Sequence, residues 1–158
     1  MKLETLVLTS AQVTAASARN AKRDALAACL AMFEAGEIKT GTSYLTGILP
    51  QGRIGIGPAV LRECARVPPS STTKLGIMEV HGLLERVNAT RGAGSAGRRR
   101  EILTTLFTRA TLTERDFLLR LLAGELRQGA LDGVMVEAIG AAFQLPSSSV
   151  RRAYMLRG

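Results

Sequence analysis

Two stretches of this sequence combine glycine and arginine at spacings that could do chemistry. Residues 83–94 and 118–129 each begin with a leucine pair and end on a glycine, 35 positions apart, with an arginine near each turn. Glycine has no side chain, so its backbone N–H can approach an anion closely, and arginine offers phosphate a planar fork of N–H groups. The chemistry that these residues indicate is the non-covalent binding of a phosphate backbone.

The candidate binding residues come from both stretches and from the start of an earlier helix. They are Arg91, Gly92, Gly94, Ser95, Arg98, Arg99, Gly124, Arg127 and Gly129, with Arg19 and Lys22 as secondary contacts. Arg19 and Lys22 fall near a helix N-terminus, where the macrodipole prefers anions, so a bound phosphate would relieve an unfavourable arrangement. A plainer interpretation stays open, in which residues 91–100 form a flexible surface turn with a solvated arginine run.

Residues suited to catalysis are scarce. His81 is the sole histidine and lies beside the apolar stripe of its helix, while Cys29 and Cys64 fall in apolar contexts typical of buried thiols. One histidine and two distant cysteines do not make a conventional zinc site. The sequence contains no Gly-x-Ser-x-Gly motif and no carboxylate pair that stands out as an acid–base couple. We therefore expect no catalytic residue and no metal site in this chain.

One motif match is misleading. Residues 92–97 read Gly-Ala-Gly-Ser-Ala-Gly and formally fit the dinucleotide-binding pattern Gly-x-Gly-x-x-Gly. That pattern needs a preceding β-strand and a surrounding βαβ unit, whereas a helix is expected before residue 92. The glycines are better explained by the close approach of a polyanion to the start of a helix.

Composition and charge limit the class of protein. The 158 residues are 46% hydrophobic, enough for one domain with a real core, and the lack of Trp with abundant Ala and Leu favours helices. The net charge of +8 and the pI near 10.5 suggest an acidic polymer as the partner. No apolar run is long enough to span a membrane and no signal peptide is recognisable, so we expect a cytoplasmic protein without a membrane partner.

The periodicity of apolar residues predicts an all-α fold, a single compact multi-helix domain. Helices are expected near residues 3–13, 18–33, 44–49, 58–66, 76–89, 95–107, 113–122, 134–143 and 146–155, with Gly76, Ser95 and Thr113 as start signals. Residues 51–57 alternate glycine and isoleucine and predict an extended loop. The Pro- and Ser-rich residues 68–75 predict a linker between an N-terminal half, residues 1–67, and residues 76–158.

Residues 76–158 are expected to contain two pseudo-repeated helical hairpins. If these hairpins pack about a pseudo-two-fold axis, both basic turns could face one side and contact the two phosphate strands that flank a groove of a duplex. Such contacts position a protein without reading sequence. No helix shows the Asn, Gln and Arg spacing needed for major-groove reading, so the binding should be sequence-independent.

The sequence resembles the N-terminal DNA-binding domain of ATP-dependent DNA ligases. Residues 121–129 followed by 134–139 resemble that family's Gly-x-Leu-Arg-x-Gly stretch and the helix after it. Residues 92–95 resemble its Gly-x-Gly-Ser segment, with Arg98 or Arg99 where lysine is usual. Residues 17–22, 44–47, 53–57 and 152–156 match in the same order, so the resemblance covers nearly the whole chain. Gln128 and Gly97 depart from the family pattern.

The resemblance implies a domain that docks on the minor groove of nicked duplex DNA and helps the catalytic core of the same polypeptide to encircle the break. It also implies a role in DNA repair, replication or recombination, and an association with the nucleoid. Ligase chemistry needs a Lys-x-Asp-Gly nucleophile, and none of the four lysines has that context. The resemblance therefore implies a fragment that binds DNA but does not seal it. The adenylation and OB-fold domains would lie outside it, and ATP and Mg²⁺ would serve the parent ligase.

Three other classes remain as alternatives. A helical protein–protein interaction module would bind a protein with little salt dependence and would not bind a duplex. A helix-turn-helix regulator would prefer one operator sequence. A free-standing small enzyme has almost no support, because the chain lacks a reactive constellation.

Overall fold

The computed structural model describes residues 1–52, 54–126 and 131–156, and these form nine α-helices. The helices are α1 (Leu3–Ala15), α2 (Arg19–Ala31), α3 (Ile38–Leu45), α4 (Pro58–Cys64), α5 (Ile77–Ala89), α6 (Ser95–Arg109), α7 (Leu112–Ala123), α8 (Leu131–Phe143) and α9 (Ser147–Met155). Apart from one isolated bridge between Lys2 and Gly76, the described residues contain no β-structure. The prediction of an all-α fold is confirmed.

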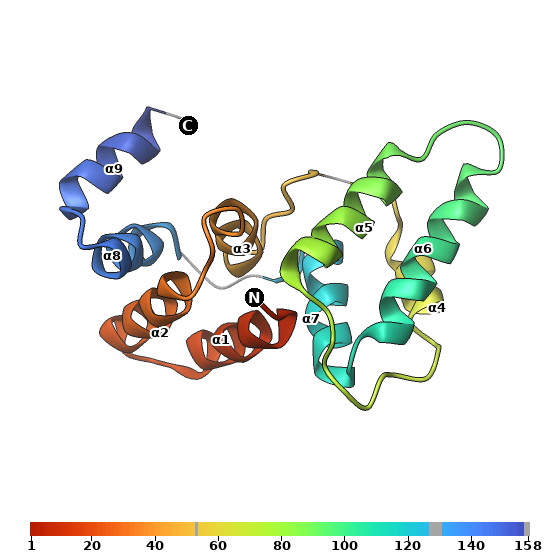
Figure 1. Cartoon of the computed structure of the whole chain (residues 1–158), viewed down its shortest axis with the longest axis horizontal. Helices are drawn as coiled ribbons and strands as arrows, with labels where there is room; N and C mark the ends of the chain where they lie inside the picture. The colour runs from red at the N-terminus through yellow and green to blue at the C-terminus, as the bar shows by residue number, and fades with distance from the viewer. Residues whose placement is uncertain (53, 127–130, 157–158) are drawn as a thin grey trace.

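Helices α1 to α8 contribute buried side chains to one apolar core, whereas α9 contributes none. Figure 1 shows how the helices are arranged. On one side, α5 and α6 run antiparallel, and α4 packs on α6 and α7. On the other side, α1 packs on α2 and α3, and α8 lies on α2 with α9 beyond it. Contacts of α1 with α7 and of α3 with α5 join the two sides. Fully buried side chains from both sides, such as Leu26, Tyr44, Leu84 and Phe107, belong to the same cluster.

Of the two predicted hairpins, the structure contains the first. α5 and α6 pack together, and an ion pair of 2.6 Å between Glu79 and Arg109 joins the start of α5 to the end of α6. The prediction that α7 and α8 form a second such pair is wrong, because α8 packs most extensively against α2. The alanine-rich face of α2 allows a neighbouring helix to approach closely, and the apolar face of α8 is buried there.

Two predicted helix starts shift by one or two residues. Ser95 is the first residue of α6 and does not cap it, because the cap position is Gly94 in a left-handed conformation. Thr111, and not Thr113, caps α7: its hydroxyl accepts a hydrogen bond from the Glu114 N–H at 3.3 Å, and the Glu114 carboxylate accepts one from the Thr111 N–H at 2.8 Å.

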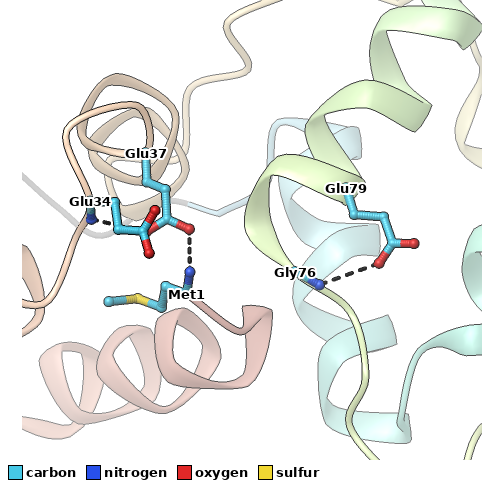
Figure 2. A network of polar contacts seen from close by, with 5 residues as sticks. All are labelled: Met1, Glu34, Glu37, Gly76 and Glu79. Atoms are coloured by element: carbon cyan, nitrogen blue, oxygen red, sulfur yellow. Dashed lines mark hydrogen bonds and ion pairs between the residues drawn. The ribbon is translucent and has the colours of Figure 1, made fainter.

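The predicted start of α5 is correct, since Gly76 occupies its cap position and its N–H lies 3.5 Å from the Glu79 carboxylate (Figure 2). The predicted bounds of the third helix, residues 44–49, are wrong, because α3 begins at Ile38 and ends at Leu45. Gly47 follows with a φ of +75°, which turns the chain away from the helix axis.

A buried carboxylate joins the starts of α1 and α3. Glu37 accepts hydrogen bonds from the α-amino group of Met1 and, at 3.1 Å, from the backbone N–H of Glu34 (Figure 2). Burial by itself would raise the pKa of Glu37, but these two donors outweigh it and lower the pKa. The carboxylate is therefore held ionised inside the fold.

The segment predicted as a linker is bonded to the rest of the fold at several points. The N–H of Ser70 donates to the carbonyl of Ala110 at 3.0 Å, and the carbonyl of Leu75 accepts from the N–H of Leu3 at 2.8 Å. Leu75 itself is fully buried.

Candidate nucleic-acid interface

The connection between α5 and α6 brings six of the predicted binding residues together. α5 stops at Ala89 because Thr90 adopts an extended conformation, and Gly92 and Gly94 then take positive φ angles of +82° and +72°. The N–H of Ser95 donates to the carbonyl of Gly92 at 3.1 Å, which closes the turn. Positive φ at two positions requires residues such as glycine, so the sequence folds into this turn for a local reason.

Three arginines surround the end of α5. Arg91 donates from Nη1 to the carbonyls of Asn88 and, at 3.1 Å, Thr90. Arg98 donates from Nη2 to the carbonyl of Arg91 at 3.1 Å, and Arg99 donates twice to the carbonyl of Thr90, from Nε at 3.1 Å and Nη2 at 2.8 Å. The last carbonyls of a helix carry partial negative charge, which offsets the repulsion among the guanidinium groups.

The start of α6 is open to an anion. In the part of the chain that the structure describes, the N–H groups of Ala96 and Gly97 have no acceptor, as is usual for the first turn of a helix. No acidic residue lies in this first turn, while Arg98 does, and a Cβ placed on Gly92 or Gly97 would contact nothing. Free N–H groups, a helix N-terminus and exposed arginine side chains together favour phosphate.

The loop after α3 lies against this turn. Residues 54–57 form a loop outside the helices, with Ile54 buried and Gly55 exposed, but the loop is not extended throughout as predicted, because Gly55 has a φ of +67°. Nη1 of Arg99 lies 3.6 Å from the position that a Cβ on Gly55 would occupy. The guanidinium group of Arg99 therefore lies between this loop and the start of the α5–α6 turn.

The second predicted turn has a different environment. Gly124 has a φ of +71° and ends α7, and the N–H groups of Glu125 and Leu126 both donate to the carbonyl of Arg120. Its positive φ is thus explained by helix termination. A Cβ on Gly47 would overlap the carbonyl oxygen of Leu126, so the turn after α3 packs directly against the residues that follow α7. Arg127 and Gly129, also predicted to bind, lie outside the described residues.

Arg19 and Lys22 are not part of the α5–α6 turn. They lie at the start of α2, at the opposite end of the molecule from that turn (Figure 1). Arg19 forms an ion pair of 2.9 Å with Glu137 of α8, which lowers the pKa of that carboxyl group. The anion that partners Arg19 is therefore the Glu137 carboxylate of the protein itself, whereas a bound phosphate was expected there. Lys22 is half-buried and has no ion pair with any described residue.

The structure offers little for catalysis. His81 is hydrogen-bonded through Nδ1 to Gln51 at 2.9 Å, and Cys29 and Cys64 are buried. Among the described residues, no group of three or more His, Cys, Asp or Glu side chains could hold a metal ion. Within the same residues, no helix has the length and apolar character that crossing a membrane requires.

The fold and this turn define a class, namely helical domains with a basic, glycine-lined edge suited to a polyanion. Residues 58–140 match the family model described as the DNA ligase N terminus. Because this match covers more than half of the 158 residues, the chain belongs to that family.

Curated relatives agree with the family. A probable DNA ligase of Rhodococcus opacus (strain B4) is 47% identical over 160 residues, which cover 100% of this chain and 31% of that protein. A probable DNA ligase of Sorangium cellulosum (strain So ce56) is 45% identical over 159 residues, covering 100% of this chain and 30% of that protein. The chain thus spans about a third of the length of the curated relatives that it matches.

Sequence reasoning missed three roles: Gly55 lies beside Arg99, Gly47 lies against Leu126, and Glu137 pairs with Arg19. Gly55 was assigned to a loop, Gly47 to a helix end, and Glu137 to the apolar helix after residue 134. The glycine between two isoleucines could have indicated a turn at Gly55, because its φ of +67° is a conformation that glycine adopts readily. No local signal could have paired Glu137 with Arg19, which lies 118 positions away.

Proposed function

We propose that this chain binds duplex DNA without sequence preference, as the N-terminal DNA-binding domain of an ATP-dependent DNA ligase. The observation that supports the proposal most is the convergence of Arg91, Gly92, Gly94, Ser95 and Arg98 in one exposed turn at the start of α6. Membership of the DNA ligase N-terminal family supports it independently.

In this proposal a phosphate group binds at the N-terminus of α6. The free N–H groups of Ala96 and Gly97 donate to it, and Gly92 and Gly94 keep side chains out of its way. Arg91 donates to the carbonyl of Thr90 and Arg98 donates to the carbonyl of Arg91, each with part of the guanidinium fork, and both keep other N–H donors for the phosphate. Contacts of this kind position the protein on the backbone and do not read the bases.

The finer features of the proposal come from the family resemblance. They are binding in the minor groove, a nick in the duplex, and a role in DNA repair, replication or recombination beside a catalytic core. ATP and Mg²⁺ belong to that core, because this chain has no Lys-x-Asp-Gly sequence that could take up AMP.

Binding to nicked and to unrelated intact duplexes, measured over a salt series, tests the proposal. Each phosphate that the protein neutralises should steepen the log–log salt dependence by roughly 0.9. We expect a slope of several units and similar affinities for unrelated sequences. Tighter binding to the nicked duplex would support the preference for a break.

Two matched variants test whether Arg98 contacts a phosphate of the duplex. Arg98→Met should weaken binding and reduce the slope by roughly 0.9, since one phosphate contact is lost. Arg152→Met removes the same charge from α9, where Arg152 is exposed and has no ion pair with a described residue, and should change the slope by much less. No duplex binding at low salt would contradict the proposal and favour a protein–protein interaction module. A strong preference for one sequence would favour a helix-turn-helix regulator.

A further inference from the structure

Three consecutive arginines at the start of α6 point in three directions. Successive residues of an α-helix are about 100° apart around its axis, so Arg98, Arg99 and Arg100 cannot all face one partner. Arg98 reaches the carbonyl of Arg91 at the exposed turn. Arg100 faces α4, where it pairs with Glu63 at 3.5 Å. Arg99 lies between these two directions and faces the end of α5.

The guanidinium group of Arg99 contacts two segments outside its own helix. Nε and Nη2 both donate to the carbonyl of Thr90, at 3.1 and 2.8 Å, which is a bidentate grip on one oxygen atom. Nη1 lies over Gly55 in the loop after α3. The side chain is half-buried, whereas Arg91 and Arg98 are exposed. One side chain thus joins α6, the end of α5 and the loop at residues 54–57.

We propose that Arg99 is a positioning residue of the DNA-binding turn and not one of its phosphate contacts. The inference rests on the proposed function, since it assigns a role within the same site. Thr90 is the C-terminal cap of α5, and the turn follows it with Arg91, Gly92, Ala93 and Gly94. By holding the Thr90 carbonyl, Arg99 fixes the point from which the turn leaves α5, and so sets where the N–H groups of the turn meet a phosphate.

The salt dependence of binding separates this role from direct contact. A guanidinium that neutralises a phosphate contributes roughly 0.9 to the slope, whereas one that is hydrogen-bonded to a carbonyl contributes little. Arg98→Met serves as the matched comparison, because it makes the same chemical change at the neighbouring residue. The free protein offers a second measurement, the hydrogen-exchange rates of the backbone N–H groups of Ser95 and of residue 98, which donate to the carbonyls of Gly92 and Gly94.

For Arg99→Met we expect a loss of affinity on the order of tenfold at every salt concentration, with the slope nearly unchanged. In the free variant, the N–H groups of the turn should exchange faster than in the wild type, while the far-UV circular dichroism stays the same. For Arg98→Met we expect the slope to fall by roughly 0.9. Its exchange rates should rise less than those of Arg99→Met, because Arg98 donates one hydrogen bond to this segment and Arg99 donates two. A residue with a merely structural role would lower the melting temperature and leave the affinity of the folded protein unchanged.

Two results would overturn the inference. One is a fall in slope for Arg99→Met that equals the fall for Arg98→Met, together with wild-type exchange rates in the turn. The other is wild-type affinity together with wild-type exchange rates. If Arg99→Met does not fold, Arg99→Lys replaces it: the charge is kept but the fork is lost, so faster exchange at a wild-type slope supports the inference and unchanged exchange contradicts it.

Failure of the proposed function would look different. In that case the wild-type protein would not bind a duplex at low salt, although the exchange rates of the free Arg99→Met protein could still rise.

Discussion

Replacing Arg115 with methionine should cost this fold a large part of its stability. Arg115 projects from α7 into the protein and is 7% exposed. Its Nη1 donates to the carbonyls of Ala65 and Val67, both at 2.7 Å, and its Nη2 donates to the carbonyl of Phe107 at 2.8 Å. One side chain therefore satisfies carbonyl groups at the ends of α4 and α6, where helical partners are absent.

The magnitude follows from what the substitution leaves behind. Methionine fills a similar volume but has no N–H group, so three carbonyls lose their donor. A buried acceptor without a partner costs about 1–3 kcal/mol, and such costs do not add fully, so we expect a loss of about 3–5 kcal/mol in the free energy of unfolding. For a domain of this size that corresponds to a fall in melting temperature on the order of 10 °C.

Urea and thermal unfolding, followed by far-UV circular dichroism, measure the effect. Arg120→Met is the matched control, because Arg120 lies on the same helix but is 47% exposed and pairs with Asp116 only at the surface. That variant should lose less than about 1 kcal/mol. If the free energies of unfolding of Arg115→Met and Arg120→Met differ by less than about 1 kcal/mol, the reasoning about the buried carbonyls is wrong.

Three further predictions test other parts of the fold. Gly47→Ala should destabilise the protein by about 2 kcal/mol or more and displace Leu126, because φ is +75° and the new Cβ would overlap the Leu126 carbonyl; urea unfolding measures the loss. The lowered pKa of Glu37 stabilises the fold above the pKa of an unfolded glutamate, about 4.3, and this contribution is lost as the pH falls through the folded value. Glu37→Gln should therefore be less stable than wild type at pH 7 by about 1–3 kcal/mol and should lose less stability on acidification, as unfolding at several pH values would show. Gly82→Ala should stabilise the protein by about 0.5–1 kcal/mol, because Gly82 lies inside α5 and a Cβ there would contact nothing. Duplex affinity should stay unchanged, and a lower free energy of unfolding for this variant would contradict the open space at Gly82.

Much of the local structure could be predicted from the sequence, because it depends on neighbours along the chain. The spacing of apolar residues predicted the helices, and Gly76 with Glu79 predicted the start of α5. The errors at Ser95 and Thr113 amount to one or two residues, because several nearby residues can serve as a cap and the packed helix selects among them.

The same reason explains why six of the eleven candidate site residues lie in one turn. Residues 91–99 come together in the structure because they are adjacent in the chain and because glycine permits the turn that α5 and α6 require. Whether these residues bind DNA is a separate question, which the salt series and its variants address.

Only the tertiary structure decided how the helices pair and which charges meet. Apolar burial is non-directional, so the apolar face of α8 could have been buried against α7 as well as against α2. The choice of α2 separates α8 from the expected hairpin and brings Glu137 to Arg19. In the same way, the apolar anchoring of Ile54 places Gly55 under Arg99. The sequence alone determined the helices and the α5–α6 turn, while packing across the core determined which arginines remain available to a phosphate.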